Sequence, residues 1–203
     1  MILAVLQARM GSTRLPGKSM ATLRGEPMII RQLERLRGAR CLSKIIVATS
    51  ADTVDDALAG FLVSRGYTVH RGAGADILAR IARCAETISS VSHVVRLKGD
   101  APFIDPGVID EAIRLALASG ADYTSNRVQQ TYPAGLDVEV IKAGALQAAA
   151  AEERDPMARI SPMRPALKVI SLTRSAISSA VSGSSWRTSG LIFTSTTSSA
   201  SVA

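Results

Sequence analysis

Short apolar runs alternate with longer amphipathic stretches along the first three quarters of the chain. The apolar runs predict strands at residues 2–8, 44–50, 67–72, 93–100, 121–126 and 136–141. The amphipathic stretches predict helices at residues 27–39, 53–65, 77–88, 106–120 and 143–154. Because strands that alternate with helices form βαβ units, this order predicts an α/β fold, with a mostly parallel sheet sandwiched by helices.

Residues at the predicted helix ends agree with this pattern. Asp76 precedes one helix, and Asp105 and Pro106 open another. Aspartate is a favoured N-cap, and proline suits the first turn. Gly120 lies at the end of the helix that Pro106 opens, a position where glycine commonly ends a helix.

Polar clusters follow several predicted strands, which is where ligands bind in parallel α/β sheets. The first cluster, QARMGSTRLPGKSM at residues 7–20, resembles a P-loop but has five residues between Gly11 and Gly17, where a P-loop has four. Pro16 also lacks the N–H that a phosphate cradle would use. The cluster still offers cations, hydroxyls and flexible backbone suited to a polyphosphate: Arg9, Arg14, Lys18, Ser12, Thr13, Gly11 and Gly17. The alternative is a solvated loop with ordinary basic residues.

Two further clusters carry carboxylates. In RLKGDAPFIDP, residues 96–106, Asp100 ends a predicted strand and suits Mg²⁺ held against phosphates, whereas Asp105 suits a helix cap. In YPAGLDVEV, residues 132–140, Asp137 and Glu139 share one face of a predicted strand. Those two carboxylates could bind hydroxyls or a metal, or form a solvent-facing surface.

Composition and charge narrow the class of protein. The first 155 residues contain all 17 acidic residues and 19 of the 24 Lys and Arg, so the predicted folded part is nearly neutral. This balance, with 3% aromatic residues, argues against a nucleic-acid binder. No apolar run approaches the roughly 20 residues of a membrane helix, and the N-terminus lacks the basic region of a signal peptide. We therefore expect a cytoplasmic protein without membrane contact, in which Cys41 and Cys84 are thiols.

The chain changes character after Asp155. The last 48 residues contain five Lys and Arg and no acid, and 17 of the 33 residues from Ser171 to Ala203 are Ser or Thr. We therefore divide the chain into a domain at residues 1–155 and a Ser/Thr-rich segment at residues 156–203, which we expect to be poorly ordered.

The opening motif ARMGSTRLPGK, residues 8–18, resembles the signature of the sugar-activating cytidylyltransferases. This family includes the acylneuraminate and 3-deoxy-manno-octulosonate enzymes, and the nearest branch is the spore coat polysaccharide biosynthesis protein F type. The resemblance continues in order through IIVATSADTVDDALA, HRGAGADILAR, LKGDAPFIDP, GADYTSN and TYPAGLDVEV, and covers roughly residues 1–155.

The resemblance implies a Rossmann-like fold of the nucleotide-diphospho-sugar transferase type. It also implies transfer of CMP from CTP to a small sugar with Mg²⁺, release of pyrophosphate, a role in polysaccharide biosynthesis, and a homodimer. By matching position, the resemblance places Arg9, Gly11, Ser12, Arg14 and Lys18 on the triphosphate. It places Thr49, Ser50, Arg71 and Asp76 near the base or ribose, and Asp137 and Glu139 at the sugar. It makes Asp100 the metal ligand, and Arg14, Lys18 and Asp100 the catalytic groups.

Two departures qualify this expectation. Lys98 stands where relatives of this branch have a small polar residue, so it could contact phosphate or pair with Asp100. The family's ending, whose acid can complete the metal site, has only faint echoes after Asp155. We hypothesise that this segment is read in a shifted frame or is otherwise degenerate. A nucleotidyltransferase for another base or acceptor, and a catalytically impaired nucleotide-binding protein, are the alternatives.

Overall fold

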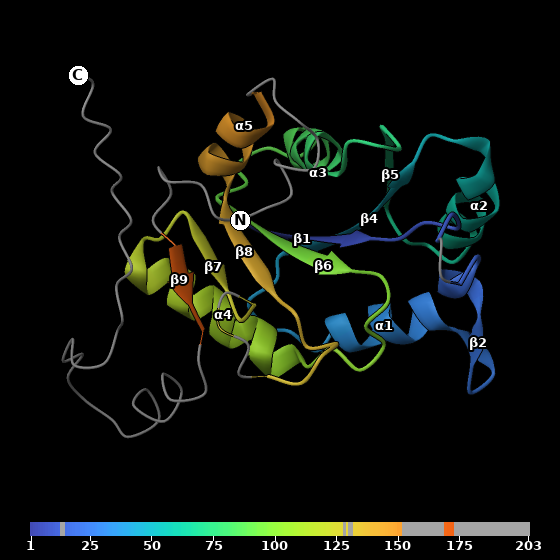
Figure 1. Cartoon of the computed structure of the whole chain (residues 1–203), viewed down its shortest axis with the longest axis horizontal. Helices are drawn as coiled ribbons and strands as arrows, with labels where there is room; N and C mark the ends of the chain where they lie inside the picture. Colours follow the sequence, from blue (N-terminus) through green and yellow to red (C-terminus); the bar gives the residue numbers. More distant parts are fainter. Residues whose placement is uncertain (13–14, 128, 130–131, 152–168, 173–203) are drawn as a thin grey trace, which may run out of the picture.

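A seven-stranded sheet forms the centre of the computed structural model, which describes residues 1–12, 15–127, 129, 132–151 and 169–172 (Figure 1). The strands lie in the order β5-β4-β1-β6-β8-β7-β9. In chain order they are β1 (Ile2–Gln7), β4 (Lys44–Ser50), β5 (Val69–Gly72), β6 (His93–Lys98), β7 (Tyr123–Ser125), β8 (Glu139–Lys142) and β9 (Val169–Ser171). A small hairpin, β2 (Thr22–Leu23) and β3 (Glu26–Pro27), follows the loop that begins after β1 and includes Lys18, which we call the opening loop.

Most strand pairs are parallel, as the sequence predicted. β5, β4, β1 and β6 pair in parallel, and β9 pairs in parallel with β7. β8 runs antiparallel to both β6 and β7. The chain places β4 on one side of β1 and later returns to place β6 on the other, so the strand order reverses at β1. Such a reversal opens a crevice beyond the carboxyl ends of the two strands.

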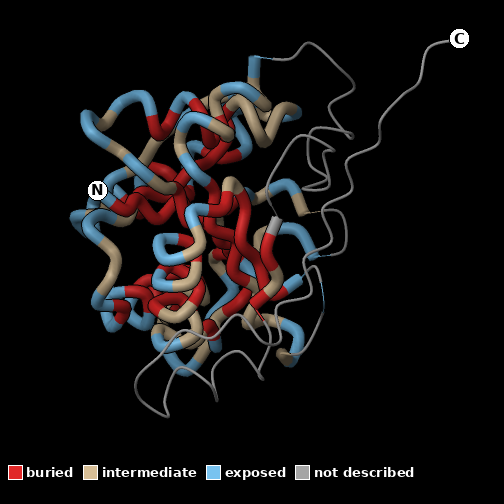
Figure 2. Tube along the Cα trace, turned by 90° about the vertical axis from the view of Figure 1, so that its left-hand side faces the viewer, coloured by how far each residue is buried: buried red, intermediate tan, exposed pale blue. Residues whose placement is uncertain are grey.

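Helices cover both faces of the sheet. In chain order they are η1 (Lys18–Met20), α1 (Met28–Leu36), η2 (Thr53–Asp55), α2 (Asp56–Ser64), α3 (Ile77–Glu86), α4 (Pro106–Ser119) and α5 (Ala143–Ala151). One core cluster joins α1, α2 and α4 to the face that carries Ala4 and Leu6. The other joins α3 and α5 to the opposite face, which carries Leu3 and Val5. Alternate residues of β1 thus point to opposite cores, and the buried residues concentrate along the sheet (Figure 2).

The predicted helix caps are confirmed at two positions. The Asp76 carboxylate accepts a hydrogen bond from the Ala79 N–H at 2.9 Å. The Asp105 carboxylate accepts one from the Gly107 N–H at 2.7 Å, and Pro106 opens α4. Gly120 ends α4 with a positive φ of 61°, a conformation that glycine adopts without strain.

Two regions differ in detail from the sequence pattern. The predicted helix at residues 53–65 forms α2, but its first turn is the separate 3₁₀ helix η2. Within the segment that we expected to be poorly ordered, β9 pairs with β7 of the main sheet and Leu172 is 1% exposed. Ile170 in β9 and Leu172 directly after it flank Ser171, and both are buried. The rest of residues 156–203 lies outside the described residues.

Candidate functional site

A cavity of about 260 Å³ opens at the point where the strand order reverses. It lies beyond the carboxyl ends of β1 and β6, and its wall includes Gln7, Ser12 and Gly99. The Gly99 N–H donates to the Gln7 carbonyl at 2.6 Å, and a Cβ on Gly99 would lie 2.5 Å from that oxygen. Only glycine allows the two strand ends to approach so closely. This contact brings the opening loop beside the loop that follows β6.

Basic side chains dominate the cavity wall. Its charged residues are Arg9, Lys18, Arg80, Arg96, Lys98 and Asp100. Five cations and one carboxylate in one concave site favour an anionic ligand. Arg80 and Arg96 were not among the predicted site residues.

Lys18 and Asp100 meet inside this cavity although 82 positions separate them in the sequence. The Lys18 ammonium donates to the Asp100 carboxylate at 2.6 Å, and their side chains are 24% and 37% exposed. Lys18 begins η1, directly after Gly17, whose positive φ of 71° turns the loop back toward β1. The structure thus brings together two residues that the sequence placed in different clusters.

Asp55 anchors the start of the opening loop, a role that our reading of the sequence missed. Its carboxylate, 1% exposed, accepts hydrogen bonds from the Met10 N–H at 2.6 Å, the Ser50 N–H at 3.0 Å and the Ser50 hydroxyl. Burial alone would raise the pKa of Asp55, but these hydrogen bonds outweigh it and hold the pKa below its usual value. Asp55 therefore ties the opening loop to the end of β4.

The residues predicted near the base or ribose lie around this anchor. Arg71 donates to the Ser50 carbonyl at 3.1 Å and pairs with Asp56 at 2.6 Å. Thr49 and Ser50 are buried at the end of β4, and Asp76 caps α3. Within the described chain, the cavity wall does not include these four predicted residues. Of the loop predictions, Arg9, Ser12 and Lys18 line the cavity, Gly11 is exposed beside it, and Arg14 lies outside the described residues.

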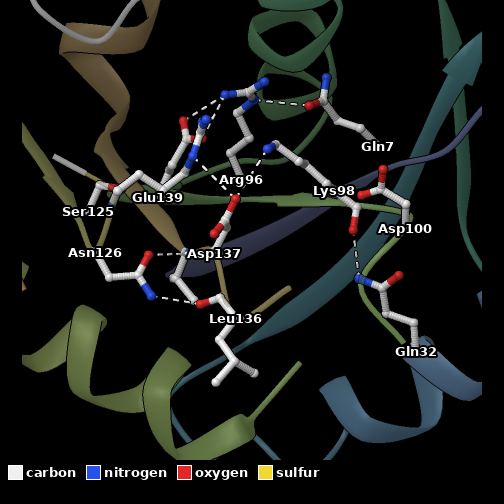
Figure 3. A network of polar contacts seen from close by, with 12 residues as sticks. Gln7, Gln32, Arg96, Lys98, Asp100, Ser125, Asn126, Leu136, Asp137 and Glu139 are labelled. Carbon is white, nitrogen blue, oxygen red and sulfur yellow. Dashed lines mark hydrogen bonds and ion pairs between the residues drawn. The ribbon is translucent and has the colours of Figure 1, made fainter. Parts of the chain in front are cut away.

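A network of ion pairs continues from the cavity toward β8 (Figure 3). Arg96 donates to both Glu139 oxygens, at 2.7 and 2.8 Å, and to the Gln7 side chain at 2.9 Å. Arg127 donates to Glu139 at 3.1 Å. The Glu139 side chain is 5% exposed and is not part of the cavity wall, so this carboxylate serves two arginines.

Asp137 pairs with Lys98 and with Arg127, both at 3.2 Å. Asp137 precedes β8, so only Glu139 of the two predicted carboxylates belongs to the strand itself. Of the two sequence-based alternatives for Lys98, pairing with Asp100 is wrong, because Lys18 contacts Asp100 and Lys98 pairs with Asp137. Lys98 lines the cavity, so its contact with phosphate stays a prediction. The Lys98 carbonyl accepts from Gln32 of α1 at 2.7 Å, which fixes the strand end (Figure 3).

The described carboxylates offer one metal ligand at the cavity. Among the residues that the structure describes, no group of three or more His, Cys, Asp and Glu side chains could hold a metal ion. Mg²⁺ often binds through one or two carboxylates together with substrate phosphates and water. A half-exposed Asp100 beside a cationic loop fits that pattern.

None of the helices among the described residues has the length and apolar character that a membrane span requires.

Comparisons with known proteins show the family of this chain. The family model described as cytidylyltransferase matches residues 3–155. The chain is 35% identical over 149 residues to the spore coat polysaccharide biosynthesis protein SpsF of Bacillus subtilis (strain 168), covering 71% of this chain and 60% of that protein. It is 38% identical over 117 residues to the 3-deoxy-manno-octulosonate cytidylyltransferase of Geobacter sulfurreducens, covering 55% and 44%. The chain thus spans about half the length of these curated relatives.

Solved structures share the fold. A cytidylyltransferase from Leptospira borgpetersenii superposes with a TM-score of 0.79 at 29% identity, covering 85% of this chain and 75% of that one. A CMP:2-keto-3-deoxy-manno-octonic acid synthetase, solved with CTP, superposes with a TM-score of 0.61 at 16% identity, covering 88% and 96%, which shows a common fold. The expected Rossmann-like nucleotidyltransferase fold and the expected family are confirmed. This chain belongs to the cytidylyltransferase family.

Proposed function

We propose that this protein transfers CMP from CTP to a hydroxyl of a small sugar and releases pyrophosphate. The observation that carries the proposal is the cavity at β1 and β6, where Lys18 and Asp100 lie 2.6 Å apart among further cations. A triphosphate carries several negative charges, and this wall presents five basic side chains to it. The identity of the nucleotide, CTP, is inferred from membership in the cytidylyltransferase family.

The opening loop would hold the triphosphate. Arg9, Ser12 and Lys18 line the cavity. The space around Gly11 is open, so its backbone is accessible to a ligand, and Arg14 would be a further cation for the phosphates. When the sugar hydroxyl attacks the α-phosphorus, its proton passes to water, the bond to pyrophosphate breaks, and negative charge develops on the leaving group. Preorganised cations stabilise that charge, so catalysis needs positioning and electrostatics with little covalent work. Arg14 and Lys18 are the catalytic cations of this proposal.

Asp100 is the residue that would hold Mg²⁺. The metal, when bound, would neutralise charge on the phosphate oxygens. The Lys18 ammonium would then bind the phosphates in place of Asp100, since the phosphates and the Asp100 carboxylate both attract it.

The sugar would bind at the β8 side of the cavity. Asp137 and Lys98 are half-exposed there, with side-chain exposures of 24% and 39%. Glu139 would act through Arg96 and Arg127 by holding both guanidinium groups. Thr49, Ser50, Arg71 and Asp76 would shape the pocket for the base or ribose from the ends of β4 and β5. We further propose a homodimer in the cytoplasm that supplies polysaccharide biosynthesis.

One observation favours a second candidate function, a nucleotide-binding protein with impaired catalysis. Asp100 is the one carboxylate that lines the cavity within the described residues. The family's second metal-binding acid has no evident counterpart in the sequence after Asp155.

Pyrophosphate release tests the proposal. Each of CTP, ATP, GTP and UTP is incubated with the full chain and a set of sugar acids and amino sugars, with and without Mg²⁺. Release that requires CTP, a sugar and Mg²⁺ supports the cytidylyltransferase. Release with another nucleotide indicates a different base, and binding of CTP without any release indicates the second candidate.

A further inference from the structure

Arg80 is a cavity residue to which the proposed function assigns no role. It is the fourth residue of α3, and helical side chains point back toward the helix N-terminus. The guanidinium therefore reaches the loop between β5 and α3 and forms part of the cavity wall. Its aliphatic stem packs on Gly72, where a Cβ would lie 3.0 Å from the Arg80 Cγ. Arg80 is only 3% exposed.

The Arg80 charge has no carboxylate partner at ion-pair distance among the described residues. One terminal nitrogen donates to the carbonyls of Ala73 and Gly74, the latter at 3.2 Å. The Nε, also buried, has no hydrogen-bond partner in the part of the chain that the structure describes. A buried cation without a counterion is costly, and proteins usually pair such groups.

Burial and one neighbouring cation both make the charged form of Arg80 less favourable. Burial lowers the pKa of Arg80, and the nearby Arg9 cation lowers it further. Asp55, Asp52 and Asp76 act in the opposite direction but do not form an ion pair with it in the described structure. Two guanidinium groups that repel each other across one cavity are stabilised by an anion placed between them.

We infer that Arg80, together with Arg9, forms a phosphate subsite of this cavity, with the Arg80 guanidinium facing the phosphates of the nucleotide. This inference rests on the proposed function for the identity of the ligand. The alternative is that Arg80 only shapes the turn at Ala73 and Gly74. In that case it would affect every ligand of the cavity alike, whether or not the ligand carries phosphate.

Calorimetric titration of the full chain with inorganic pyrophosphate, CTP and cytidine separates these roles. For Arg80→Met, affinity for pyrophosphate and CTP should fall about tenfold to a hundredfold, because a charge-assisted hydrogen bond is lost. Affinity for cytidine, which has no phosphate, should stay within about twofold. Arg80→Lys should retain part of the pyrophosphate affinity, and it keeps the test open if Arg80→Met does not fold.

Arg83→Met is the matched control on the same helix. The Arg83 side chain is 77% exposed and pairs with Glu86, so binding of all three ligands should be unchanged. Unchanged pyrophosphate affinity in a folded Arg80 variant, or an equal loss for cytidine and CTP, overturns the subsite. Wild-type protein that binds pyrophosphate but not CTP contradicts the proposed function and leaves the subsite intact.

Discussion

Neutralising Glu139 should destabilise the fold strongly, because its carboxylate compensates a buried arginine. The Arg96 and Glu139 side chains are 10% and 5% exposed and form a bidentate pair at 2.7 and 2.8 Å. In Glu139→Gln the shape is kept, but Arg96 loses its charged partner and retains only neutral acceptors, the introduced amide oxygen and that of Gln7. Removing one partner of a buried pair costs about 3–5 kcal/mol. The Arg127 contribution is smaller, since Arg127 is 42% exposed and water screens it.

Urea unfolding followed by circular dichroism at pH 7 measures this free energy. We expect Glu139→Gln to lose about 3 kcal/mol of the 5–15 kcal/mol typical of a domain. Glu86→Gln is the matched control, because its pair with Arg83 is exposed and 3.6 Å long, and it should change stability by less than about 0.5 kcal/mol. Arg96→Met combined with Glu139→Met should recover part of the loss, since an apolar pair leaves no uncompensated charge. A loss below about 1 kcal/mol in Glu139→Gln would refute this account of the network.

Three further predictions follow from the same structure. Lys18→Met and Asp100→Asn should each lower the rate of CTP-dependent pyrophosphate release by about a hundredfold or more, and unchanged turnover would remove both from the site. Gly99→Ala should lower the free energy of unfolding in urea by about 1–3 kcal/mol, because the added Cβ would lie 2.5 Å from the Gln7 carbonyl oxygen. Gly60→Ala in α2, where the space around the glycine is open, should raise it by about 0.5–1 kcal/mol. Equal effects of the two substitutions would contradict this reasoning. Burial raises the pKa of Cys84 from 9.0 to about 11, so the unfolded thiol loses its proton first and stability should fall as pH rises from about 9 to 11; a Cys84→Ala variant that keeps the same decline would show another group to be responsible.

The sequence predicted the parts of the fold that depend on local pattern. Short apolar runs identified β1, β4 and β6, and side-chain chemistry identified the caps Asp76 and Asp105. It did not predict β9, because three residues between non-periodic segments carry little signal of their own.

The sequence pattern anticipated that Lys18 and Asp100 lie close together, because their loops follow neighbouring parallel strands. The sequence did not reveal the contacts that depend on tertiary packing. Arg96 and Glu139 face each other only because β8 runs antiparallel to β6 with those two residues in register, which the sequence of either strand does not specify. Asp55 and Arg80 look like ordinary helix residues until the fold buries them against loops from elsewhere in the chain.

Crystals of the protein grown with CTP and Mn²⁺ test the central claim most directly, because manganese can be located by its anomalous scattering. The account predicts a manganese peak at coordination distance from the Asp100 carboxylate, with the triphosphate lying among Arg9, Ser12 and Lys18. A triphosphate bound elsewhere on the molecule, or manganese remote from Asp100, would contradict it.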